Sequence, residues 1–137
     1  MARYRTLSER NKYYIPKEDY LTAIHYSLRL PLWVAEIEAT ADTRDAIRYD
    51  KDKVQTSNNY DSTEAAGIRI YELSKKVSII KETIETASDG SGLDRWLEMG
   101  VCYGFTFYQL KEKGMPCERD MYYNIRQRYY YLLAQKI

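Results

Sequence analysis

The chain has 137 residues, of which 45% are hydrophobic and 30% are charged, a balance typical of a single globular domain and not of a disordered chain. Cys102 and Cys117 lack the spacing of metal ligands and have no cluster of Cys or His near them, which argues against a zinc site and a disulfide framework. No hydrophobic stretch approaches the roughly 18 residues that span a bilayer, and no secretory leader is recognisable. We therefore expect a cytoplasmic protein with no membrane partner, no metal and no cofactor.

The charges are distributed unevenly, although the formal net charge is only +1. Residues 1–14 and residues 106–137 each carry three more basic than acidic residues, whereas residues 21–105 carry four more acidic than basic ones. A polyanion would therefore bind near the two ends of the chain. The 15 tyrosines are unusual as well, and their apolar rings with polar tips suit either a thin core or a surface that contacts a partner.

The N-terminal part, residues 1–41, is predicted to form an arm followed by a helical hairpin. Leu21, Ile24 and Leu28 have the three-and-four spacing of one helix face. Pro31 should kink or interrupt the helix because proline lacks a backbone donor, and the second helix should end near residue 41. The residues before the first helix show no periodicity and are interpreted as the arm.

A polar loop or linker is predicted over residues 42–62, which are rich in Asn, Ser and Asp. The third region, residues 63–137, begins with a long helix that has Asp61 or Ser62 as its cap and ends near Ala87. Its apolar residues step by four and three in alternation: Ala66, Ile70, Leu73, Val77, Ile80, Ile84 and Ala87.

This stripe admits two explanations. Its β-branched positions suit a parallel two-stranded coiled coil, which would make a homodimer through residues 63–87. Lys76 and Lys81 would repel each other across such a dimer, and packing against the helices of residues 17–41 explains the stripe as well. We favour the intrachain packing and leave the homodimer open.

Glycines mark the next helix boundaries. Residues 88–92 contain two glycines among Ser and Asp, a pattern that ends helices. A short helix is predicted over residues 93–103, with Trp96 and Leu97 as its anchors, and Gly104 should close it.

The segment from Thr106 onward carries the most specific local signals. Thr106 and Gln109 have the spacing of a capping box, in which each side chain satisfies an amide at the start of a helix. Gly114 should end that helix after about two turns, Met115 should fill the corner, and Pro116 suits the first turn of the next helix. The sequence therefore predicts a short helix, a three-residue turn and a longer helix.

The helix after Pro116 has a basic, aromatic face. Met121, Ile125 and Leu132 share one side and are predicted to pack inward, and Arg128 near them should reach a phosphate or an acidic residue. The residues predicted to face outward are Arg119, Tyr123, Arg126 and Tyr130, flanked by Glu118, Tyr122 and Gln127. Such a face is often merely solvated, but it also suits entry into a DNA major groove, where arginine binds guanine edges or phosphates.

The C-terminal part of the chain resembles the RinA/ArpU-like family of phage and prophage late-gene transcription regulators. The matching stretches are DKDKVQTSNNYDSTEA (residues 50–65), KKVSIIKETIE (75–85) and FYQLKEKGMPCERDMYYNIRQRYYYLL (107–133). The resemblance implies an all-α helical bundle with a long central helix and a C-terminal, sigma-factor-like helix-turn-helix. It further implies inter-helix packing by Leu110 and Met115, and a recognition helix that includes Cys117, Glu118, Arg119, Tyr122, Tyr123 and Arg126.

We therefore expect a sequence-specific transcription regulator that binds double-stranded DNA through Cys117, Glu118, Arg119, Tyr122, Tyr123, Arg126, Gln127 and Tyr130. Host RNA polymerase or another host protein is a further candidate partner. An enzyme is not expected, because His25 is the single histidine and none of the six glycines belongs to a nucleotide-binding cluster. The alternative is a small phage-encoded module that binds and inhibits a host protein complex, as anti-CRISPR proteins do.

Overall fold

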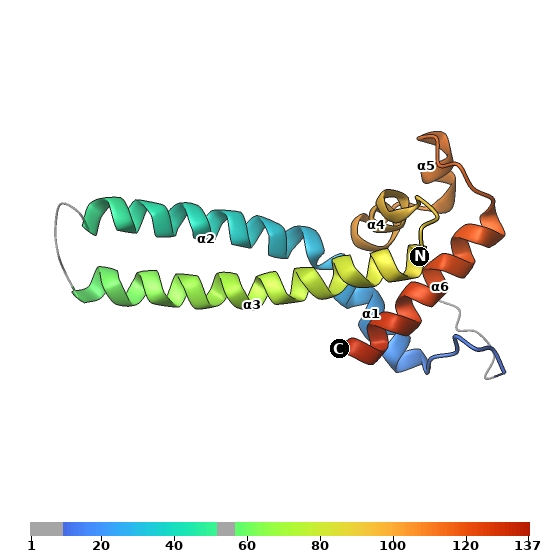
Figure 1. Cartoon of the computed structure of the whole chain (residues 1–137), viewed down its shortest axis with the longest axis horizontal. Coiled ribbons are helices and arrows are strands. Elements are labelled where there is room, and N and C mark those ends of the chain that lie inside the picture. Colours follow the sequence, from blue (N-terminus) through green and yellow to red (C-terminus); the bar gives the residue numbers. More distant parts are fainter. Residues whose placement is uncertain (1–9, 52–56) are drawn as a thin grey trace. The chain divides into compact units, whose positions relative to one another are not determined.

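The structure is a computed structural model that describes the backbone of residues 10–51 and 57–137, and the side chains of residues 10–42 and 64–137. This part of the chain is all-helical and contains no strand, as predicted (Figure 1). No helix in it combines the length and the hydrophobicity that crossing a bilayer requires. The helices are α1 (Lys17–Leu28), α2 (Leu30–Lys51), α3 (Ser57–Ser88), α4 (Asp94–Tyr103), α5 (Phe107–Glu112) and α6 (Arg119–Lys136).

The contacts divide the chain into two compact units. The first, which we call the core unit, joins the residues up to Leu30 with Ile79–Ile137, and the second, the hairpin unit, comprises Pro31–Ser78. The sequence placed the divisions after residues 41 and 62 instead. The break at Leu30 is close to Pro31, where an interruption was predicted, because proline is readily accepted only in the first turn of a helix.

In the hairpin unit, α2 lies antiparallel to the part of α3 that ends at Ser78 (Figure 1). Glu36 accepts a hydrogen bond from Arg69 at 2.9 Å, and the Lys76 ammonium lies 5.3 Å from the centre of the Trp33 ring. Leu73, from the predicted stripe, is fully buried. The two helices are therefore held together by apolar burial and by an ion pair at the edge.

The predicted loop over residues 42–62 is wrong where the structure describes it. Helix α2 continues to Lys51 and α3 begins at Ser57, so the expected helix end near residue 41 and the expected cap at Asp61 or Ser62 are also wrong. Residues 52–56 lie outside the described part. Helix propensities of Asn, Ser and Asp differ from that of alanine by only about 0.7 kcal/mol or less each, and every residue added to an existing helix gains a backbone hydrogen bond.

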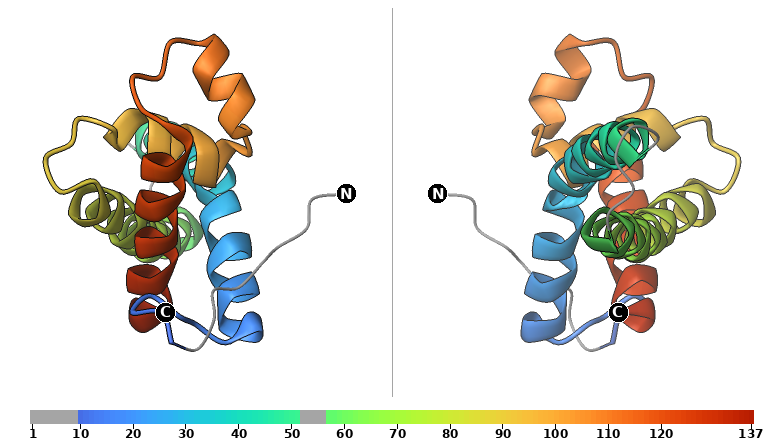
Figure 2. Two further views of the ribbon diagram at one scale, coloured as in Figure 1. Left: turned by 90° about the vertical axis from the view of Figure 1, so that its right-hand side faces the viewer. Right: turned by 90° about the vertical axis from the view of Figure 1, so that its left-hand side faces the viewer.

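The core unit packs α1 beside α6, with α4 in contact with both (Figure 2). Ile80, Ile84 and Ala87 from the end of α3 are buried here. Four of the seven stripe residues, Leu73, Ile80, Ile84 and Ala87, are therefore buried within the chain itself, and a homodimer is not needed to explain them. Ala66, Ile70 and Val77 are only partly buried. Between α1 and α6, the hydroxyls of Ser27 and Tyr129 form a buried hydrogen bond of 2.7 Å.

The predicted helix boundaries around α4 are confirmed. Helix α3 ends at Ser88, and Asp89, Gly90 and Gly92 follow with positive φ angles. Helix α4 ends at Gly104, whose φ of 76° lies in the left-handed region that glycine adopts without a steric penalty.

Candidate nucleic-acid interface

Helix α5 is fixed at its start by the predicted capping box. The Gln109 amide donates to the Thr106 hydroxyl at 3.2 Å, and the Thr106 amide donates to the Gln109 side-chain oxygen at 2.9 Å. Phe107 and Leu110 then face inward and are buried. The box therefore sets where α5 begins and, with it, which of its residues meet α6.

The chain turns between α5 and α6 at the predicted glycine. Gly114 has a φ of 102°, and the next amide, that of Met115, donates to the Leu110 carbonyl at 3.1 Å. Met115 is buried in the corner, as predicted. Its burial fixes the corner by apolar contact as well as by the backbone hydrogen bond.

The connection is longer than the predicted three-residue turn, because α6 begins at Arg119 with Glu118 as its exposed N-cap. Cys117 was expected on the recognition helix, but it lies before α6 and is buried. Burial raises the pKa of its thiol. Cys117 therefore belongs to the packed corner and does not face a partner.

Helix α6 buries only part of the predicted face. Ile125 is buried as predicted, together with Tyr122, Tyr129 and Leu133, whereas Met121 is 45% exposed and Leu132 is only partly buried. Tyr122, expected on the outer flank, reaches inward because Gly100 on α4 leaves room for it. A Cβ atom at Gly100 would lie 1.9 Å from the Tyr122 hydroxyl oxygen. Burial raises the pKa of Tyr122 to about 12, although the charge of Arg126 opposes the rise.

Tyr130 was also predicted to face outward and is buried instead. Helix α1 covers it, and the rings of Tyr130 and Tyr20 meet edge to face with their centres 5.3 Å apart. Burial raises the pKa of the Tyr130 phenol well above its usual value. The outward face of α6 therefore stops short of Tyr130, at the point where α1 begins to cover the helix.

Three side chains form the accessible part of the predicted face, which we call the ridge: Arg119, Tyr123 and Arg126. The carbon at the centre of each guanidinium lies near the middle of the Tyr123 ring, at 5.5 Å for Arg119 and 4.5 Å for Arg126. Phe107 supports the same ring, with 6.1 Å between centres. Stacking of this kind orders an arginine side chain without using its hydrogen-bond donors.

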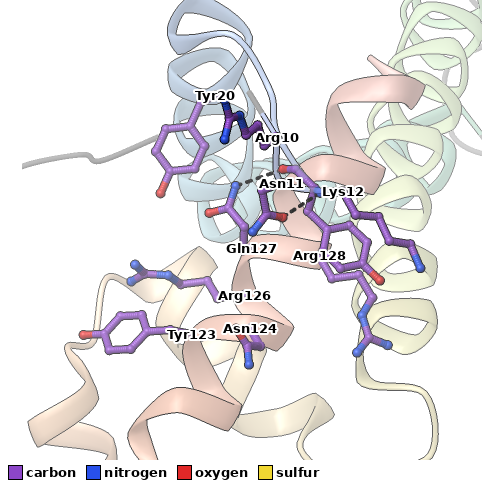
Figure 3. Close-up of a pocket in the computed structure, with 10 residues that line it drawn as sticks. Arg10, Asn11, Lys12, Tyr20, Tyr123, Asn124, Arg126, Gln127 and Arg128 are labelled. Atoms are coloured by element: carbon purple, nitrogen blue, oxygen red, sulfur yellow. Dashed lines mark hydrogen bonds between the residues drawn. The ribbon is translucent and has the colours of Figure 1, made fainter. Parts of the chain in front are cut away.

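A pocket of about 710 Å³ lies beside the ridge, between residues 10–13 and α6 (Figure 3). Four cationic side chains line it, Arg10, Lys12, Arg126 and Arg128, and no carboxylate does among the residues that the structure describes. Arg126 belongs to both the ridge and the pocket. The arrangement is electrostatically suited to an anion, because no described lining side chain offsets the positive charge.

Residues 10–13, which belong to the first basic cluster of the sequence, are docked on α6. The Gln127 side-chain amide donates to the Tyr13 carbonyl at 3.3 Å, and the rings of Tyr13 and Tyr131 meet at 5.5 Å. Asn11 tightens the segment by accepting a hydrogen bond from the Tyr13 amide at 2.9 Å. Gln127, predicted to contact DNA, thus has a structural partner, and we call its contact with Tyr13 the latch.

Arg10, Lys12 and Asn124 line the pocket as well, although they were not predicted as site residues. The basic excess at both chain ends was the available signal, but it does not indicate that the two ends meet. Arg128 was expected to reach either a phosphate or an acidic residue. Among the residues that the structure describes it has no ion-pair partner, and its Nε is buried without a hydrogen bond.

The two features together offer fixed guanidinium donors beside an uncompensated positive pocket, a combination that suits phosphate groups and base edges. Comparison with family models, with curated proteins and with solved structures finds no match. The functional conclusion therefore depends on the geometry of the ridge and of the pocket.

Proposed function

We propose that the chain is a sequence-specific, DNA-binding transcriptional regulator of phage or mobile-element origin, as its resemblance to the RinA/ArpU-like family implies. In this proposal α5 and α6 form a helix-turn-helix, and α6 is the helix that reads DNA. The observation that carries the proposal is the ridge of Arg119, Tyr123 and Arg126, which continues into a pocket whose charged lining residues, among those that the structure describes, are all cationic.

The burial of α6 restricts the DNA-contacting set to its N-terminal half. Arg119 is exposed, Tyr123 and Arg126 are half-buried, and Glu118, the N-cap of α6, is exposed. Arg119 and Arg126 are suited to bidentate contacts with guanine or phosphate, and the Tyr123 phenol to donating a hydrogen bond to a phosphate oxygen. Cys117, Tyr122 and Tyr130 are buried, so we do not include them among the residues that contact DNA.

The test begins by selecting a preferred duplex from a random-sequence pool with the full chain. We expect Arg119→Ala combined with Arg126→Ala to weaken binding to the selected duplex by about tenfold or more, since each good arginine–guanine contact contributes about 1–3 kcal/mol. Fluorescence anisotropy measures the affinity, and circular dichroism verifies that the variant is folded.

The matched control replaces two arginines elsewhere in the core unit, Arg29→Ala with Arg95→Ala. Both are exposed and neither lines the pocket, so the change of net charge is identical. We expect this control to bind within about twofold of the wild type, since distant surface charges are screened over about 10 Å. An unchanged affinity in the folded Arg119→Ala, Arg126→Ala variant would contradict the proposal.

The alternative, a module that binds a host protein, has one observation in its favour. Leu32, Ile68 and Tyr71 of the hairpin unit are large apolar residues that are more than half exposed, and such surfaces often contact proteins. Host RNA polymerase is the partner that a regulator would meet there. Capture from host lysate with and without nuclease separates the two functions, because nuclease removes only partners that are held through nucleic acid.

A further inference from the structure

Within residues 10–42 and 64–137, whose side chains the structure describes, no carboxylate forms an ion pair with a cation of the pocket. Among the described residues, the ion pairs are Arg69–Glu36 and Lys81–Glu98, and neither involves a pocket residue. Lys12 lies 5.2 Å from the centre of the Tyr13 ring, a contact that orders the ammonium group without neutralising it. Like charges held this close repel one another, so a bound anion would relieve the repulsion as well as form new contacts.

The position of the cations indicates the kind of anion. Figure 3 shows Arg126 and Tyr123 on one side of Gln127, and Lys12 and Arg128 on the other. One phosphate group cannot lie against both sides of a central side chain at once. A chain of phosphates, each separated from the next by a sugar, matches cations that are distributed across α6 in this way.

Two neighbouring hollows show where such a chain would run. One, of about 320 Å³, shares Tyr123 and Arg126 with the pocket and so adjoins the ridge. The other, of about 480 Å³, shares Asn124 and Arg128 but adds the carboxylate of Asp89. Because that carboxylate would repel phosphate, the favourable path extends from Arg128 toward Arg126 and ends before Asp89.

We infer that the pocket between residues 10–13 and α6 is a binding site for the phosphate backbone of one DNA strand, separate in role from the ridge that reads bases. The inference rests on the proposed function and deepens it. Arg10, Lys12 and Arg128 supply the charge, and the latch from Gln127 to the Tyr13 carbonyl holds the N-terminal segment in place for binding. Phosphate contacts position a protein on DNA and carry no sequence information directly. The N-terminal segment therefore contributes affinity, and the ridge contributes selectivity.

The experiment compares the full chain with the Arg10→Ala, Lys12→Ala variant on two probes, the selected duplex and a scrambled duplex of the same length. We expect the variant to lose affinity for both probes by the same factor. The slope of log affinity against log salt should become shallower by about two, because each lost phosphate contact removes about 0.9 from it. The ridge variant for this comparison is Arg119→Ala alone, because Arg119 does not line the pocket and every pocket cation is kept. It should instead lose mostly its preference for the selected duplex.

Two further variants make the test specific to this pocket. Lys17→Ala with Arg29→Ala removes two exposed cations of the core unit that do not line the pocket, and its salt slope should equal that of the wild type. Gln127→Ala breaks the latch and leaves every cation present. We expect it to weaken binding to both probes equally, since Arg10 and Lys12 are then no longer held against α6.

The outcomes distinguish this inference from the proposed function. Arg10→Ala, Lys12→Ala is the pocket variant. If it keeps the affinity and the salt slope of the wild type while the ridge variant loses selectivity, the phosphate site is wrong and the proposed function stands. If the pocket variant binds both probes more weakly while the ridge variant keeps the wild-type selectivity, the phosphate site stands and sequence-specific reading by α6 is wrong. If the wild-type chain binds neither probe, both proposals are wrong.

Discussion

Gly100 and Tyr122 pack closely against each other in the core unit. The Tyr122 ring occupies the space that a side chain at Gly100 would fill, since a Cβ there would lie 1.9 Å from the hydroxyl oxygen and 3.2 Å from the ring carbon that bears it. The hydroxyl is buried and has no hydrogen-bond partner among the described residues. Its position is therefore determined by shape and not by hydrogen bonding.

Replacing Gly100 with alanine should lower the free energy of unfolding by about 1–3 kcal/mol, the usual cost of overpacking a core. Urea denaturation measures the change. The second variant, Gly100→Ala with Tyr122→Phe, removes the atom that would clash and loses no hydrogen bond, so we expect it to recover most of the loss. Additive losses in the double variant would show that the clash is not with the hydroxyl.

The Ser27–Tyr129 pair predicts an asymmetry between two substitutions. The Ser27 hydroxyl lies 2.9 Å from the Ala23 carbonyl and 2.7 Å from the Tyr129 oxygen. A hydroxyl has one proton to donate. Ser27 therefore donates to Ala23 and accepts from Tyr129.

Ser27→Ala leaves the buried Tyr129 hydroxyl without an acceptor and should lower the free energy of unfolding by about 1–3 kcal/mol. Tyr129→Phe leaves the Ser27 donor bond intact and should cost less, about 1 kcal/mol. Urea denaturation of both variants and of the double variant gives the coupling energy. If the two single variants lose equal stability, the assignment of Tyr129 as donor and Ser27 as acceptor is contradicted.

At the scale of the element, the corner between α5 and α6 depends on one backbone conformation. Gly114 has a φ of 102°, and no atom lies within 4 Å of where its Cβ would be. A side chain would therefore fit, and the cost of adding one comes from the backbone alone.

Gly114→Ala should lower the free energy of unfolding by about 1–2 kcal/mol, the penalty for a left-handed conformation with a Cβ. Lys113→Ala is the matched control, because Lys113 has a φ of −83° and its exposed side chain makes a cation–π contact with Phe105. That contact contributes about 0.5–1 kcal/mol at an exposed site. Thermal or urea denaturation compares the two, and equal losses would mean that the corner does not require glycine.

At the scale of the whole molecule, buried phenols couple stability to alkaline pH. Burial raises the pKa of Tyr122 to about 12, and it raises the pKa values of Tyr129 and Tyr130 as well. In the unfolded chain the same phenols ionise near pH 10. Unfolding therefore releases protons above that pH, so that raising the pH favours the unfolded state.

We expect the free energy of unfolding to be independent of these tyrosines below about pH 10 and to fall steadily above it. Each phenol contributes up to about 1.4 kcal/mol per pH unit until the pH reaches its folded pKa. Urea denaturation across the alkaline range measures the slope, and Tyr129→Phe should make it shallower. Tyrosinate absorbance that rises fully while the helical circular dichroism signal persists would contradict the burial of these groups.

Local signals determined where most helices of the core unit begin and end. The capping box of Thr106 and Gln109, the turn at Gly114 and the stop at Gly104 were all predicted correctly, because each depends on residues within a few positions along the chain. The same reasoning failed over residues 42–51 and 57–62, where polar composition indicated a loop and the chain is helical. Weak local preferences there yield to helix propagation.

The sequence by itself also determined that the ends of the chain are basic and that α6 has arginines and tyrosines on one side. Only the tertiary structure decided which tyrosines are buried, because Tyr122 depends on the absent side chain of Gly100 and Tyr130 depends on α1. The pocket is likewise a tertiary feature, since Gln127 and Tyr13 are 114 positions apart. Hydrophobic periodicity indicates which side of a helix is apolar. The space that a neighbouring helix leaves open determines which side chains enter the core.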